Sequence, residues 1–112
     1  MTVTRGDGMD PNDEMTAALQ NLAASADHQL TLFDALAPTP DRLAADFDHW
    51  WRLLCEDQKL DHAKRRALKA VALQLAAMTA DRWLWTADAL RDKPAWARVR
   101  KLAEEALAAL TA

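Results

Sequence analysis

The sequence predicts an all-α protein that folds as a small bundle of four to five helices. It contains 25 Ala and 17 Leu among 112 residues, but only three Val, no Ile and no Tyr. Ala and Leu favour helices, whereas strands favour β-branched and aromatic side chains. Both glycines lie at positions 6 and 8, so no glycine interrupts the rest of the chain. At this length we expect one domain over residues 11–112, preceded by a flexible leader over residues 1–10.

Prolines and capping residues predict where the helices of the first half begin. Asp10 and Pro11 combine a capping side chain with a proline at the first helical position, which predicts a helix over residues 11–24. Ser25 can cap a second, short helix. The segment 39–41, Thr-Pro-Asp, repeats the signature and begins a third helix. The apolar side chains of this helix recur at helical spacing and form one stripe: Leu43, Phe47, Trp50 and Leu54.

The second half predicts two further helices, and the first of them is capped by Asp61. Its apolar stripe consists of Leu68, Val71, Leu75 and Met78. Beyond Ala70 the sequence AVALQLAAM is apolar nearly all round, which predicts a central, largely buried helix. Residues 79–81 either cap a new helix or mark a bend, and RWLWTADAL continues the helical pattern, with Trp83, Ala87 and Leu90 on one side. The segment 92–94, Asp-Lys-Pro, begins the last helix.

The residues that catalysis needs do not form a recognised pattern. No glycine follows Gly8, so no glycine-rich loop is present to hold phosphate. The motifs CxxC, HxxxH and ExxH do not occur among the three histidines and one cysteine: His28, His49, His62 and Cys55. Cys55 stands beside two leucines and is expected to be a small core residue. We therefore expect a protein that is not an enzyme and that carries no metal ion and no cofactor.

Three features of the sequence predict a cytoplasmic protein. A single cysteine excludes an internal disulfide and fits a reducing compartment. No apolar run approaches the roughly 20 residues of a membrane span. The first ten residues lack the apolar core of a secretory signal.

Charge is distributed unevenly along the chain. Residues 1–57 carry three basic and eleven acidic side chains, a balance of −8, whereas residues 58–112 carry eleven basic and six acidic ones, a balance of +5. Such asymmetry suggests a surface that faces a polyanion, or self-association of oppositely charged halves. Alternatively, the two halves neutralise each other within one fold.

The basic second half offers candidate contacts to a nucleic-acid backbone: Arg65, Arg66, Lys69, Arg98 and Lys101. Nearby tryptophans offer stacking surfaces for unpaired bases: Trp83, Trp85 and Trp96. The alternative is that i, i+4 ion pairs such as Arg100–Glu104 occupy a solvated face and that the tryptophans belong to the core.

The consecutive tryptophans Trp50 and Trp51 predict a contact surface. Because neighbouring helical positions lie about 100° apart, both indoles cannot face the same core. Trp50 continues the apolar stripe, so Trp51 is the candidate contact for a partner protein.

A five-residue segment, QLTLF at positions 29–33, suggests a docking peptide. Gln29 can fix a peptide by hydrogen bonds, and three apolar side chains, Leu30, Leu32 and Phe33, can anchor it in a preformed pocket. The segment resembles the short motif with which bacterial polymerases, mismatch-repair proteins and replication regulators bind the DNA sliding clamp. The resemblance implies docking through Gln29, Leu30, Leu32 and Phe33, and the proline-broken connection that follows predicts an accessible segment. A helix that buries the Leu32 edge in the bundle is the alternative.

Three functional hypotheses follow from these features. The first is a non-enzymatic adaptor or inhibitor of a bacterial nucleic-acid machine, tethered to the sliding clamp through QLTLF. The second is a small subunit of a nucleoprotein complex, similar in size and helix content to the helical subunits of CRISPR effectors. The third is a phage-encoded or antitoxin-like inhibitor whose acidic half meets a basic protein; its acidic residues are Asp41, Asp46, Asp48, Glu56 and Asp57.

Overall fold

The structure is a computed structural model that describes residues 11–32, 39–56 and 60–111. It confirms the all-α fold, and no strand occurs in these ranges. Six α-helices and one 3₁₀ turn follow each other in the order α1 (Pro11–Ala23), α2 (Ala26–Gln29), α3 (Thr39–Cys55), α4 (His62–Met78), η1 (Arg82–Leu84), α5 (Ala87–Asp92) and α6 (Pro94–Thr111). The expected leader, residues 1–10, and Phe33 lie outside the described residues.

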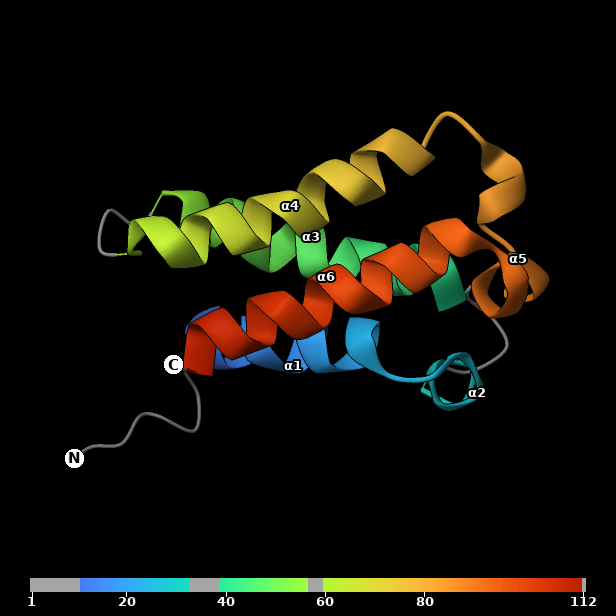
Figure 1. The fold of residues 1–112 in the computed structure, drawn as a ribbon, viewed down its shortest axis with the longest axis horizontal. Helices are drawn as coiled ribbons and strands as arrows, with labels where there is room; N and C mark the ends of the chain where they lie inside the picture. The colour runs from blue at the N-terminus through green and yellow to red at the C-terminus, as the bar shows by residue number, and fades with distance from the viewer. Residues whose placement is uncertain (1–10, 33–38, 57–59, 112) are drawn as a thin grey trace.

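The four long helices form the bundle, and the two short ones lie together at one end of it (Figure 1). α6 packs against both α1 and α4, and α1 packs against α3. α3 and α4 complete the ring, but they touch each other less closely than the other neighbouring pairs. The contact between α3 and α4 is therefore the loosest side of the bundle.

The apolar stripes predicted from helical spacing meet in one hydrophobic core. Each long helix contributes at least three side chains that are almost entirely buried, among them Met15 and Leu19 of α1, Phe47 of α3 and Val71 of α4. Trp96 of α6 is the largest of them. Burying one such side chain contributes about 1.5–3 kcal/mol, so this core is the main source of stability.

Two of the predicted caps are confirmed. The Ser25 hydroxyl accepts a hydrogen bond from the backbone N–H of His28 at 3.2 Å and begins α2. The Asp61 carboxylate accepts one from the backbone N–H of Lys64 at 2.9 Å and begins α4. Each cap satisfies a backbone donor that has no partner within its helix, which stabilises the helix start by about 1 kcal/mol.

The prediction that α4 is largely buried beyond Ala70 is wrong for one side of the helix. Leu73 is 59% exposed, and Ala76 and Ala77 are exposed as well. α4 packs against α6 on one side and α3 on the other, and no described element covers its outer side. Leucine and alanine are good helix formers on any side, so their presence indicated the helix without indicating burial.

The prediction of a continuous helical pattern over RWLWTADAL is also wrong. The Asp81 carboxylate accepts from the backbone N–H of Trp83 and begins the 3₁₀ turn, and Thr86 then caps the separate helix α5. Trp83 consequently lies 71% exposed while Leu90 is buried, so the two do not share a side.

The indoles of Trp85 and Trp96 stabilise the corner between α4 and α6, which consists of residues 79–93. The Trp85 indole N–H donates to the Met78 carbonyl at 2.9 Å, and that of Trp96 donates to the Leu84 carbonyl at 2.6 Å. The two rings meet edge to face, with centroids 5.3 Å apart. The Met78 carbonyl also accepts from the Asp81 backbone N–H at 3.2 Å, so the Trp85 indole is its second donor, whereas the Trp96 indole supplies a donor to a carbonyl of the 3₁₀ turn.

None of the helices in the described part of the chain combines the length and the apolar character that crossing a bilayer requires.

Candidate protein-binding surface

Gln29, the first residue of the predicted docking segment, is buried. Its exposed fraction is 0%, and its side-chain amide donates to the backbone carbonyls of Asn21 at 2.9 Å and Leu22 at 3.0 Å. These carbonyls stand at the end of α1, where the helix no longer supplies its regular donors, and the Asn21 carbonyl otherwise accepts only a long bond of 3.4 Å from the Ala24 N–H among the bonds described. The prediction that this segment is accessible is therefore wrong for Gln29, because its amide caps the preceding helix.

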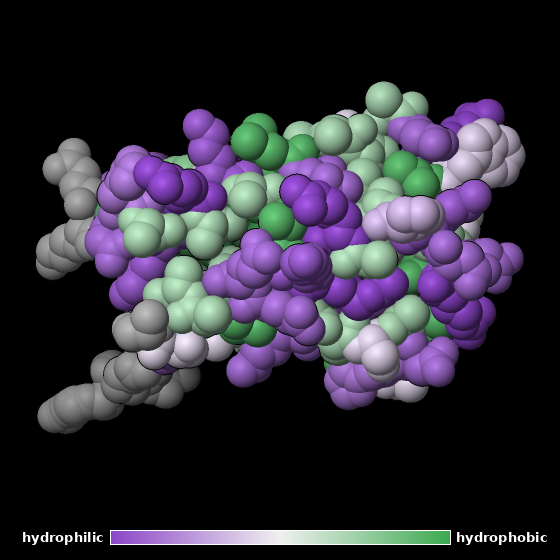
Figure 2. Space-filling view, in the orientation of Figure 1, coloured by the Kyte–Doolittle hydropathy of each residue, from purple (hydrophilic) through white to green (hydrophobic). Residues whose placement is uncertain are grey.

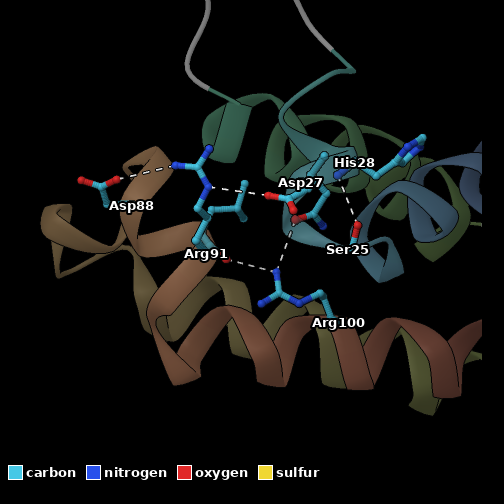
Figure 3. A network of polar contacts seen from close by, with 8 residues as sticks. Ser25, Asp27, His28, Asp88, Arg91 and Arg100 are labelled. Carbon is cyan, nitrogen blue, oxygen red and sulfur yellow. Dashed lines mark hydrogen bonds and ion pairs between the residues drawn. The ribbon is translucent and has the colours of Figure 1, made fainter.

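Arg100 of α6 completes the environment of Gln29. Its guanidinium donates to the Gln29 side-chain oxygen at 3.3 Å and to the Leu90 carbonyl at 3.2 Å. Figure 3 shows Arg100 reaching from α6 toward α2. The polar atoms of one glutamine thus join α1, α2 and α6, and among the described residues no buried side-chain nitrogen or oxygen lacks a partner.

An outer pair of contacts lies beside this buried network. Arg91 of α5 stands between Asp27 of α2 and Asp88 of its own helix, with N–O distances of 3.8 Å to each (Figure 3). Asp27 and Arg91 come from the acidic and the basic half of the chain. Both carboxylates are almost fully exposed, so water screens these ion pairs and they add little stability.

The remaining described residues of the segment are half-buried. Leu30 and Leu32 pack against the core, and only Thr31 is exposed. Phe33 lies outside the described residues. Docking through Gln29 and Leu30 in the manner of a clamp-binding peptide would therefore require α2 to separate from α1 and α6.

The basic residues of α4 do not form one cluster. Arg65 turns toward α3 and donates to the Cys55 carbonyl at 3.3 Å, whereas the Arg66 guanidinium lies 3.0 Å from the His62 ring nitrogen. Arg66 and Lys69 are exposed. The two sites predicted on α6, Arg98 and Lys101, are exposed on the helix that packs beside α4. Four of the five predicted cations are therefore exposed. On α6, however, two exposed acidic residues, Glu104 and Glu105, follow Arg98 and Lys101 and offset their positive charge.

The three candidate stacking tryptophans have different surroundings. Trp96 is fully buried and Trp85 is half-buried against it. Trp83 is 71% exposed, with the Arg82 guanidinium 5.5 Å from the centre of its ring. Only Trp83 presents a ring surface of the kind that stacking on a base requires.

An apolar groove runs between α3 and α4, where the bundle is loosest. Its volume is about 360 Å³. Phe47 and Leu75 form the buried floor, and the rim carries Asp48 and Arg52, whose side chains pair at 2.8 Å. Four alanines from the two helices line it: Ala44, Ala45, Ala72 and Ala76. Because alanine side chains are short, a second backbone can approach closely here. We call this site the α3–α4 groove.

Exposed apolar side chains continue from the groove onto the outer side of α4. They follow each other at helical spacing over the second half of the helix and just beyond it: Leu73, Ala76, Ala77 and Ala80. In Figure 2 green and pale green side chains lie along the upper edge of the molecule, over this half of α4, while purple dominates over its first half. We call these four residues the α4 strip.

Trp51 is half-buried on α3, the helix that also contributes Phe47 to the floor of the groove. Its ring lies parallel to that of Phe47, with centroids 6.4 Å apart and an interplanar angle of 14°. Trp50 is half-buried too, so both tryptophans flank the core without being sealed within it. Contact of Trp51 with a partner stays a prediction.

The expectation that Cys55 is a small core residue is wrong. Its thiol is exposed at the end of α3, one position past the apolar stripe. Within the described ranges, no three side chains of His, Cys, Asp or Glu stand close enough to hold a metal ion together.

The comparisons with known proteins found no match: no protein-family model, no curated protein and no solved structure is similar to this chain.

The α3–α4 groove was not predicted from the sequence. Its signal was present as alanine pairs on two neighbouring helices, Ala44–Ala45 and Ala72–Ala76. In an alanine-rich chain these pairs do not stand out, because alanine is equally common where helices pack tightly and where they face solvent.

Proposed function

We propose that this protein is a non-enzymatic helical interaction module, an adaptor or inhibitor, that binds a partner protein through the α3–α4 groove and the α4 strip. The observation that carries the proposal is the open apolar groove, in a bundle where every buried polar side chain of the described residues has a hydrogen-bond partner. Binding of an amphipathic helix in a hydrophobic groove is a common mode of peptide recognition.

Two features of this surface support protein binding. The groove and the α4 strip are adjacent, since Ala76 belongs to both, so they form a single apolar area. Charged side chains border that area, with Asp48 and Arg52 on α3 and Lys69 on α4. An apolar centre with a polar rim is the usual composition of a protein interface.

Site-directed charge placement in the groove tests the proposal. Ala45 and Ala76 are exposed and line the groove from opposite helices, so Ala45→Glu and Ala76→Glu introduce a charge without disturbing the core. The matched control is Ala108→Glu, the same change at an exposed alanine of α6. We expect affinity capture from the native host, followed by mass spectrometry, to recover a protein with the wild type and the control but not with either groove variant. Equal recovery with all four proteins would refute the proposal.

Nucleic-acid binding is the second candidate function, and the exposure of four cations on neighbouring helices favours it: Arg66, Lys69, Arg98 and Lys101. A backbone contact of this kind would weaken by orders of magnitude between 50 and 200 mM salt if several phosphates were neutralised. Fluorescence anisotropy with labelled single-stranded and duplex oligonucleotides measures this directly. Affinity that does not change with salt or with the double change Arg66→Glu and Lys69→Glu would exclude it.

A further inference from the structure

We infer that the α3–α4 groove binds a second copy of this chain, so that the two copies form a weak dimer about a two-fold axis through the groove. The inference rests on the proposed function, because it names the partner that this surface binds. Its basis is the placement of charge beside the groove: Asp41 is an exposed carboxylate on the groove side of α3, and Lys69 is an exposed cation on the groove side of α4. The other two exposed charges on that side of α3, Asp48 and Arg52, pair with each other at 2.8 Å.

The relative direction of the two helices follows from their contacts. Arg65, near the beginning of α4, bonds to Cys55 at the end of α3. Figure 1 shows the start of α3 and the end of α4 at the same end of the bundle, and Ala44 and Thr79 from these two ends both line the groove. The two helices therefore run antiparallel, and Asp41 in the first turn of α3 lies at the opposite end of the groove from Lys69.

Helical spacing places the relevant charges beside the groove. Asp41 precedes the rim residue Asp48 by seven residues, which is two helical turns, so both lie on the same side of α3. Lys69 precedes Ala76 of the groove wall by seven residues and lies on the same side of α4. Asp41 and Lys69 are both exposed.

A two-fold axis through the middle of the groove brings these charges together. The rotation places α3 of one copy over α4 of the other, and it exchanges the two ends of the groove. Asp41 of each copy then faces Lys69 of the other, and the alanine walls meet at the centre. This is the self-complementarity that a symmetric dimer interface requires.

The size of the surface predicts the strength of the dimer. A 17-residue helix is about 25 Å long, and two helices side by side are about 20 Å wide, so the contact is about 500 Å² per copy. Stable interfaces of standard size bury about 800 Å² per partner. We therefore expect a reversible dimer with a dissociation constant in the micromolar range, held at its ends by salt-sensitive ion pairs.

Charge exchange between two variants tests the geometry. In a dimer of Asp41→Lys, the lysine at position 41 of each copy faces Lys69 of the other copy, and the two repel each other. In a dimer of Lys69→Asp, Asp41 of each copy faces the aspartate at position 69 of the other copy, which is also repulsive. An equal mixture of the two variants forms a heterodimer in which both contacts are attractive. We expect sedimentation velocity at 50 mM salt to show that each variant alone dimerises about tenfold more weakly than the wild type, and that the mixture restores dimerisation.

Lys101→Asp is the matched control, because it reverses an exposed lysine on α6 and leaves the groove unchanged. The wild type and this control should dimerise equally, and both should dissociate further at 500 mM salt. A monomeric wild type at concentrations of a few hundred micromolar, or a mixture no stronger than its components, would overturn the inference. In that case, loss of partner capture by Ala45→Glu and Ala76→Glu would still support the proposed function, whereas unchanged capture would refute it independently.

Discussion

Replacement of Gln29 by leucine should destabilise the protein well beyond what a surface change would do. The wild-type side chain donates two hydrogen bonds to the end of α1 and accepts one from Arg100. Leucine has a similar size, so the change removes the polar contacts with little loss of volume. It removes the side-chain donor of the Leu22 and Asn21 carbonyls, of which Asn21 keeps only the long bond from the Ala24 N–H, and it removes one acceptor from Arg100.

The expected loss can be estimated from these three bonds. Each of the two amide–carbonyl bonds contributes about 1 kcal/mol net. The bond from Arg100 is charge-assisted, but at 3.3 Å it is long, so we assign it about 1 kcal/mol as well. The total of about 3 kcal/mol is a large part of the roughly 5–15 kcal/mol that stabilises a domain of this size. It corresponds to a fall in Tm of about 12 °C.

Urea unfolding followed by circular dichroism measures this loss. The midpoint of Gln29→Leu should fall by more than about 1 M relative to the wild type. Gln20→Leu is the matched control, since it makes the same substitution at an exposed position of α1, and it should change the free energy of unfolding by less than about 0.5 kcal/mol. If the two variants are equally stable, Gln29 does not hold α2 in place, and the reasoning about the docking segment fails.

Three further predictions concern the corner, a cap and the docking segment. Trp96→Phe should lower the free energy of unfolding by about 2–3 kcal/mol, because it removes the bond to the Leu84 carbonyl and leaves a cavity, whereas Trp83→Phe at an exposed position should be neutral in the same urea assay. Asp61→Ala should cost about 1 kcal/mol and Asp61→Asn much less, since asparagine also caps; equal losses would contradict the capping role. A synthetic peptide of residues 27–37 should bind a bacterial sliding clamp more tightly than the full chain does in surface plasmon resonance, and Arg100→Met should narrow the difference by loosening the contact with Gln29. Equal binding of peptide and full chain would show that burial of Gln29 does not limit access.

Much of the fold was predictable because its signals are local. The apolar stripe of α3 and the caps Ser25 and Asp61 depend on residues within one or two turns of each other, and the structure confirms them. The same approach failed over residues 82–90. There Asp81 and Thr86 cap two separate elements, and the turn between them is held by the Trp85 indole, which donates to the Met78 carbonyl of α4, and by the Trp96 indole of α6, which donates to the Leu84 carbonyl. No periodicity within that segment indicates such a contact.

The candidate site was predictable only in part. Exposure of Arg66, Lys69, Arg98 and Lys101 follows from charge, because an unpaired ion is costly to bury. The role of Gln29 could not be predicted from the sequence, because an amide that can anchor a docking peptide can equally cap a helix of its own chain. The choice depends on whether carbonyl acceptors and a guanidinium lie within reach of the amide, and their positions are set by the packing of α1 and α6 around α2.

The sequence alone determined that this chain is helical, where most of its helices begin and which side of most of them faces the core, because propensity, capping and periodicity act within a few residues. Tertiary structure decided which apolar residues stay outside. Leu73 and the alanines of the groove are apolar, as core residues are, but they lie at the surface of the protein. The physical reason is that α4 packs mainly against two other helices of the described chain, α6 and α3, so its outer side remains uncovered whatever its residues are.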